Sequence, residues 1–123
     1  MTTIIDERRE LWKKLAPIMG EDSDLAAGML IMALRREFGY PIKEEDQPRF
    51  QAAFDRLPRG STVKPQPLPV SSYSGNTGPY WSVIFIESGS QHRSSKRFDT
   101  KAEAEAYADD FLFRLEEARL AGL

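Results

Sequence analysis

The feature that most constrains the fold is a short segment, 80–86, whose β-branched and aromatic residues predict a strand. Alternate side chains along a strand point to opposite faces of a sheet. The residues on one face would be Trp81, Val83 and Phe85, and those on the other Tyr80, Ile84 and Ile86. Both faces are apolar, so a sheet built on this strand needs cover on both sides. Helices elsewhere in the chain, or a second copy of the chain, would supply that cover.

The residues after this strand predict a hairpin followed by a helix. Segment 87–91 predicts the hairpin loop, and segment 92–98 predicts a more polar return strand. Thr100 and Glu103 have the spacing of a capping box, in which each side chain bonds the backbone N–H of the other residue. A long helix is therefore expected over about 101–120.

The first part of the chain predicts three helices, over about 6–19, 23–38 and 47–57, because apolar residues recur there at spacings of three and four. The middle helix is apolar on most sides, which indicates that it is buried on most sides. Three residues at its start, Asp22, Ser23 and Asp24, offer an N-cap ahead of Leu25.

A stretch rich in proline and glycine, 58–79, separates the helical part from the second half of the chain. Its prolines predict an extended chain close to polyproline II, lying over the surface as a spacer. Within this stretch, 70–74 is the candidate for a short edge strand, and 75–78 predicts a turn.

Together these elements predict an α+β fold in one small domain, 1–123. A helical block, 1–57, would pack with a small antiparallel sheet formed by 80–86, 92–98 and, at its edge, 70–74. The long C-terminal helix would complete a ββα block and cover one face of that sheet.

One part of the chain, about residues 79–108, resembles a known type of module. The resemblance is carried by Tyr80-Trp81-Ser82-Val83, a glycine-containing turn, and the run from Lys96 to Ala108. This pattern is similar to the small sheet-plus-helix modules at the N-termini of tyrosine-type phage integrases, which bind arm-site DNA. The resemblance implies the ββα fold and, in that family, DNA contact by the sheet face. The net charge of −2 departs from that family, so the fold is carried over and the activity is not.

Composition excludes several kinds of site. The chain has no Cys and a single His, His92, which excludes Cys-ligated zinc, iron–sulfur clusters and thiol nucleophiles. His92 lies near Ser94, but the pattern does not supply the third group that nucleophilic catalysis requires. Neighbouring acids on a helix, such as Asp109 and Asp110, diverge by about 100° and do not converge as a catalytic pair. We expect no cofactor and no metal, and an enzyme with carboxylate-based chemistry is the second alternative.

Charge is distributed unevenly in the second half. Residues 88–101 hold four cations and one anion, a net charge of +3, whereas residues 102–120 hold two cations and six anions, a net charge of −4. The basic hairpin over 92–101 could contact phosphates or meet an acidic protein surface. The overall charge of −2, from 17 cations and 19 anions, argues against electrostatic coating of nucleic acid.

We therefore expect a small non-enzymatic regulatory or adaptor protein that binds another protein, with a homodimer as a further candidate assembly. The alternative is a nucleic-acid-associated module that uses the basic hairpin. The residues expected to contact a partner are Tyr73, Tyr80, Trp81, His92, Arg93, Lys96 and Arg97. Neither an apolar run of membrane-spanning length nor a basic leader with an apolar core is visible, which predicts a cytoplasmic protein with no membrane partner.

Overall fold

The computed structural model describes residues 4–74 and 79–123. Its elements follow the chain in the order α1, α2, a short 3-10 helix η1, α3, β1, β2, β3 and α4. Their bounds are Ile4–Met19 (α1), Ser23–Phe38 (α2), Glu44–Asp46 (η1), Gln47–Asp55 (α3), Leu68–Ser74 (β1), Tyr80–Glu87 (β2), Ser90–Arg93 (β3) and Lys101–Leu120 (α4). Within these ranges, four α-helices and a three-stranded antiparallel sheet confirm the expected α+β fold class.

The helical half is organised around α2. Ten of its 16 residues are buried, as its apolar circumference predicts. α1 packs along it through a buried stripe that includes Leu11 and Leu15. α3 joins through Phe50, whose ring meets that of Phe38 edge-on at 5.9 Å between centres. The end of α2 lies beside the turn between β2 and β3, where the Arg36 guanidinium donates to the Ser88 hydroxyl at 3.2 Å.

The sheet has the strand order β1-β2-β3, and both neighbouring pairs are antiparallel. Ile84 of β2 lies between Val70 of β1 and Arg93 of β3. β2 and β3 are joined by Ser88 and Gly89, whose φ angles of 51° and 81° are those of a tight two-residue hairpin turn. The strand with the strongest sequence signal is therefore the central strand.

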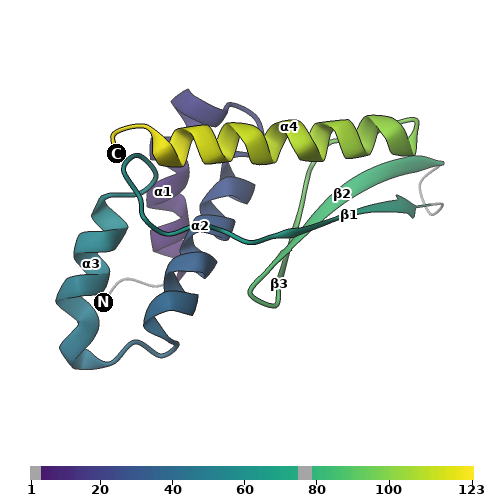
Figure 1. Ribbon diagram of the computed structural model, residues 1–123. Helices are drawn as coiled ribbons and strands as arrows, with labels where there is room; N and C mark the ends of the chain where they lie inside the picture. The colour runs from purple at the N-terminus through teal and green to yellow at the C-terminus, as the bar shows by residue number, and fades with distance from the viewer. Residues whose placement is uncertain (1–3, 75–78) are drawn as a thin grey trace.

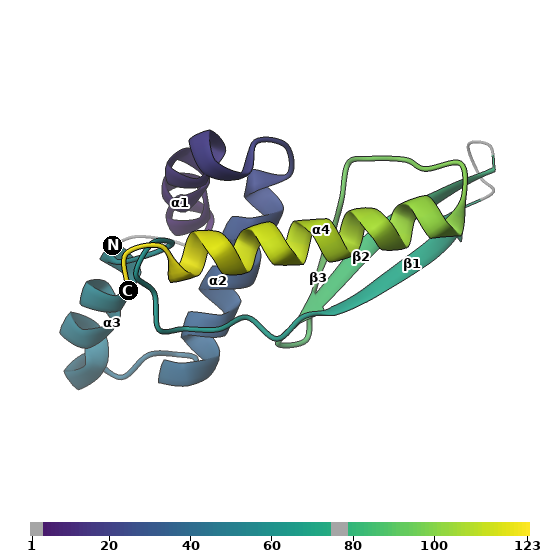
Figure 2. The same ribbon diagram turned by 45° about the horizontal axis from the view of Figure 1, so that its top comes forward.

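α4 joins the two halves of the molecule. Its N-terminal part lies along the sheet and its C-terminal part reaches the helices, as Figures 1 and 2 both show. The ring of Phe111 packs on that of Phe85 at 5.1 Å between centres, and both side chains are fully buried. His92 lies opposite Phe85 in the register and faces Gly28 of α2. Both α2 and α4 therefore pack on one face of the sheet and leave the other face open.

The proline- and glycine-rich connection is docked from residue 58 to residue 67, and the expectation of a surface spacer was wrong. Ser61 and Pro65 are buried. The Arg119 guanidinium of α4 donates to the carbonyl of Ser61 at 3.0 Å, and the N–H of Gly60 donates to the carbonyl of Arg119 at 3.1 Å. These partners lie about half the chain length away, so local composition does not reveal them.

The expected return strand 92–98 is interrupted. β3 ends at Arg93, and the chain rejoins β2 only at Phe98, which exchanges two backbone hydrogen bonds with Trp81. Between these points Ser94 and Ser95 turn toward the carboxylate of Asp22. A tertiary contact thus replaces ladder pairing in the middle of the segment.

The other expected elements differ from the structure by a few residues. The second and last helices have the expected ends, whereas the first starts at Ile4 and the third ends at Asp55. The edge strand starts two residues earlier than expected, at Leu68. The turn expected at 75–78 lies outside the described residues.

Candidate functional site

The sheet face turned away from α2 and α4 is here named the open sheet face. The register places on it Leu68, Val70, Ser72 and Ser74 of β1, Tyr80, Ser82, Ile84 and Ile86 of β2, and Gln91 and Arg93 of β3. Leu68 is 62% exposed, and Ile84 and Ile86 remain partly exposed although they lie in the central strand. One end of the face is therefore apolar. The other end carries hydroxyl groups, two of which, on Ser72 and Ser82, bond each other at 3.1 Å.

The charges of the open sheet face are positive. The Arg97 guanidinium lies over the Tyr80 ring, 4.6 Å from its centre, and adds a second cation to that of Arg93. None of the described residues registered on this face is acidic. Exposed apolar side chains beside two cations suit a partner surface that carries apolar and acidic groups.

Three of the seven residues expected to contact a partner lie at this face: Tyr80, Arg93 and Arg97. Tyr73 and Trp81 lie on the covered face at the end of the sheet, where their rings meet edge-on at 5.6 Å. Lys96 forms an ion pair with Glu21 at 2.7 Å, beside a hollow at the start of α2. The expected set is therefore divided between two faces and the interior.

His92, expected to contact a partner, is instead buried at 5% exposure. A methyl group added to Gly28 would come within 2.8 Å of its ring, so the missing side chain on α2 makes room for the imidazole. Neither ring nitrogen has a hydrogen-bond partner among the described residues. Burial first, and then the nearby Arg8 guanidinium, lower the pKa of His92, against the opposing charges of Glu87 and Asp24.

This burial predicts that the folded protein loses stability as the pH falls below about 6.5. The unfolded chain binds a proton on His92 near its ordinary pKa of 6.5, whereas the folded chain binds it only at lower pH. Stability is therefore fully present above this pH and falls by up to about 1.4 kcal/mol per pH unit below it, until the folded chain protonates too.

Urea unfolding between about pH 7.5 and pH 5 measures this loss. The variant His92→Gln should show a flatter profile in that window, because His92 is the only imidazole in the chain. The same pH slope in the variant and the unaltered protein would show that another group is responsible.

Asp22 connects α2 to the hairpin and to α4, and of the three residues expected to offer an N-cap it takes that position without capping through its side chain. It precedes Ser23, but its side chain makes no hydrogen bond to the first turn. Its carboxylate accepts hydrogen bonds from the hydroxyls of Ser94 at 2.6 Å, Ser95 at 3.0 Å and Tyr107. Burial raises the pKa of Asp22, but these bonds outweigh it and leave that pKa below its ordinary value.

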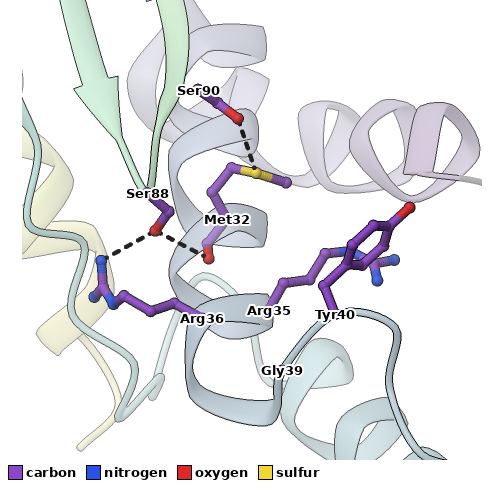
Figure 3. Close-up of a pocket in the computed structure, with 7 residues that line it drawn as sticks. All are labelled: Met32, Arg35, Arg36, Gly39, Tyr40, Ser88 and Ser90. Carbon is purple, nitrogen blue, oxygen red and sulfur yellow. Dashed lines mark hydrogen bonds between the residues drawn. The ribbon is translucent and has the colours of Figure 1, made fainter.

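A hollow of about 670 Å³ lies between the end of α2 and the β2–β3 turn (Figure 3). Its lining residues are Met32, Arg35, Arg36, Gly39, Tyr40, Ser88 and Ser90. The Arg35 guanidinium lies against the Tyr40 ring, 5.1 Å from its centre, and bonds Glu7 of α1 at 2.6 Å. The Ser90 hydroxyl donates to the sulfur of Met32 at 3.3 Å. Several side chains that line the hollow are therefore already in contact with one another or with α1.

Arg36 fastens the hairpin tip to α2. Glu87 is fully buried, and its carboxylate accepts hydrogen bonds from the Arg36 guanidinium, from the Ser88 hydroxyl at 3.0 Å and from the N–H of Gln66 at 2.6 Å. Each arginine of the hollow thus has a carboxylate partner. The hollow has no unpaired charge that could attract a ligand, because both arginines are already paired. It is therefore a weaker candidate binding site than the open sheet face.

Within the described ranges, no three acidic or imidazole side chains converge to hold a metal ion. The Ser94 hydroxyl donates to Asp22, and no hydrogen bond joins it to His92. None of the helices in the described part of the chain is both long enough and apolar enough to cross a membrane.

Sequence reasoning placed the edge strand at 70–74 but missed its start, and with it the place of Leu68 on the open sheet face. Leu68 and Val70 stand in the proline-rich stretch, and Pro69 between them argues against a central strand. An edge strand tolerates a proline whose nitrogen faces outward. Apolar residues at alternate positions around Pro69 are the signal that could have extended the expected strand to Leu68.

Comparison of the chain with protein-family models, curated proteins and solved structures gives no match.

Proposed function

We propose that this protein is a small adaptor that binds another protein through its open sheet face. The observation that carries the proposal is the apolar end of that face, where Leu68 lies opposite Ile86 and Val70 lies opposite Ile84. All four side chains are at least partly exposed. Apolar patches that remain exposed and are rimmed by polar groups are typical of protein interaction sites.

The charges of the face favour a partner with carboxylates over a second copy of the chain. Arg93 lies beside Ile84 at the apolar end, Arg97 lies over Tyr80 at the other end, and no acidic residue is registered on this face in the described strands. Two copies packed face to face would bring together two cations from each, four in all, without a compensating anion. Like charges at an interface reduce affinity, whereas an acidic partner would pair with them.

Nucleic-acid binding is the alternative, and the position of Arg93 and Arg97 at one surface favours it. Two cations would give only a weak, salt-sensitive contact with phosphates. Nucleic-acid binding also leaves the exposed Leu68 and its apolar neighbours without a role. If it occurs, replacing both arginines with alanine should lower affinity for every sequence and reduce its dependence on salt.

Replacing Leu68 with glutamate should reduce capture of the partner by at least about tenfold, because a charge would be buried against apolar groups. Phe113→Glu is the matched control, since Phe113 is also 62% exposed but lies on α4, away from the open sheet face. Tagged full chains would be compared by co-purification from the native cell, with captured proteins quantified by mass spectrometry. Circular dichroism would confirm that both variants fold. Equal capture by the two variants would contradict the proposal.

A further inference from the structure

We infer that the outer edge of β1 is a docking site for an extended, basic peptide segment, which would join the sheet as a fourth strand. This surface is separate from the open sheet face, because it consists of the backbone edge of β1 and the acidic side of α4 next to it. The inference does not rest on the proposed function. A protein with both surfaces could hold two partners at once.

The hydrogen bonds of β2 define which way its backbone groups point. Trp81 exchanges both of its backbone bonds with Phe98, and Val83 accepts from the N–H of Ser94. The N–H and C=O of a strand residue point to the same neighbour, and successive residues alternate. The odd-numbered residues of β2 therefore bond the β3 side, and its even-numbered residues bond β1.

Ser71 and Tyr73 consequently present unpaired backbone groups at the edge of the sheet. Each lies opposite an odd-numbered residue of β2, so its N–H and C=O point away from that strand. Among the described residues, no backbone group bonds these outward groups. An edge of this kind is a template for strand addition. Pro69 has no N–H, which confines full pairing to the part of β1 that follows it.

The side of this edge that faces α4 is acidic. A small hollow of about 100 Å³ is lined by Pro69, Ser71, Glu105, Ala108 and Asp109. The two carboxylates are exposed and lie one helical turn apart. The Glu105 carboxylate forms an ion pair with the Lys101 ammonium at 3.8 Å, and Asp109 forms none in the described part of the chain. A cation on an added strand would therefore find carboxylate partners there.

These features define the chemistry of the segment. Side chains alternate across a strand, so every second residue of an added strand would face α4 and its carboxylates. The residues between them would lie on the open sheet face beside Val70, Ser72 and Ser74, where β-branched side chains suit a strand. Lysine or arginine alternating with β-branched apolar residues fits both requirements. A second copy of β1 fits less well, because edge-to-edge pairing would bring Glu105 and Asp109 of two copies together.

The test uses the full chain labelled with nitrogen-15 and a capped peptide of alternating lysine and valine, as long as the 7 residues of β1. At saturation, the amides of Ser71 and Tyr73 should exchange with solvent at least about tenfold more slowly. The amide of Ser72 already faces β2 and should change little. A matched peptide with glutamate in place of lysine should not bind.

Variants distinguish the contribution of the β1 backbone edge to peptide binding from that of the carboxylates of Glu105 and Asp109. Glu105→Gln combined with Asp109→Asn should weaken binding about two- to tenfold, whereas Glu117→Gln, elsewhere on α4, should not. Ser71→Pro removes an outward N–H and should weaken binding at least about tenfold, whereas Ser71→Ala keeps that group and should bind normally. If Ser71→Pro does not fold, amide exchange at Ser71 and Tyr73 in the unaltered chain tests the inference alone.

Unchanged exchange at Ser71 and Tyr73 would overturn the inference. So would equal binding of the glutamate peptide, peptide contacts confined to the open sheet face, or protection of both amides by self-association of the chain alone.

Discussion

Replacing Arg36 with alanine is expected to lower the free energy of unfolding by about 1–3 kcal/mol, because a buried carboxylate loses a partner that is itself partly exposed to solvent. The carboxylate of Glu87 is fully buried, and the Arg36 guanidinium is the cation that balances it. Without that guanidinium the interior would hold a charge supported only by the N–H of Gln66 and the hydroxyl of Ser88. Urea unfolding followed by circular dichroism measures the change.

Two further variants test this cause. Arg36→Ala combined with Glu87→Gln should recover most of the lost stability, because the buried charge is removed together with its partner. Arg49→Ala breaks an exposed ion pair with Asp46 at 3.4 Å and should change stability by no more than about 0.5 kcal/mol. A loss for Arg36→Ala no larger than that for Arg49→Ala would contradict the assignment.

Replacing Phe111 with alanine is expected to cost about 3–5 kcal/mol, because it opens a cavity where α4 meets the sheet. The Phe111 side chain is fully buried and packs on Phe85 and, at 6.2 Å between ring centres, on Tyr107. Since α4 contacts both the sheet and the helical half, the whole molecule should unfold in one transition at lower denaturant concentration.

Phe113→Ala is the control on the same helix. Its side chain is exposed, so the change should stay within about 0.5 kcal/mol. A separate early transition in Phe111→Ala, with the helical half still folded, would contradict the view that α4 joins the two halves into one cooperative unit.

Local signals accounted for the regular elements of the fold. One half of the expected capping box forms: the Thr100 hydroxyl accepts from the N–H of Glu103 at 3.2 Å, while the Glu103 carboxylate bonds that hydroxyl at 3.1 Å. The apolar circumference of α2 predicted its burial, and the composition of β2 predicted a strand. These features depend on residues close together in the chain, which is why sequence patterns reveal them.

Features that depend on distant residues were not predictable in the same way. The connection after α3 is docked because Arg119, near the other end of the chain, bonds Ser61. His92 is buried because Gly28 leaves space for its ring, although its neighbours are polar. Asp22 has the residue type of a helix cap, but Ser94 brings a competing donor within 2.6 Å. In each case a tertiary contact outweighs the local preference.

Only part of the candidate site could be predicted, because the rest of it also depends on residues distant in the chain. Aromatic and basic residues near β2 identified Tyr80, Arg93 and Arg97, but the apolar end of the face depends on pairing between β1 and β2. The expected edge strand 70–74 did not include Leu68, because the proline-rich composition around it does not indicate a strand. The edge groups of Ser71 become visible only when the register is known.

Placing a photoreactive amino acid at Leu68, and at Phe113 as the matched control, tests most directly whether the open sheet face binds a protein. Both positions are 62% exposed, but only the first lies on that face. Irradiation in the native cell should give a protein adduct from position 68 that is absent from position 113 and is lost when Arg93 and Arg97 are replaced by alanine. A nucleic-acid adduct, an adduct of two copies of the chain, or no adduct specific to position 68 would contradict the proposal.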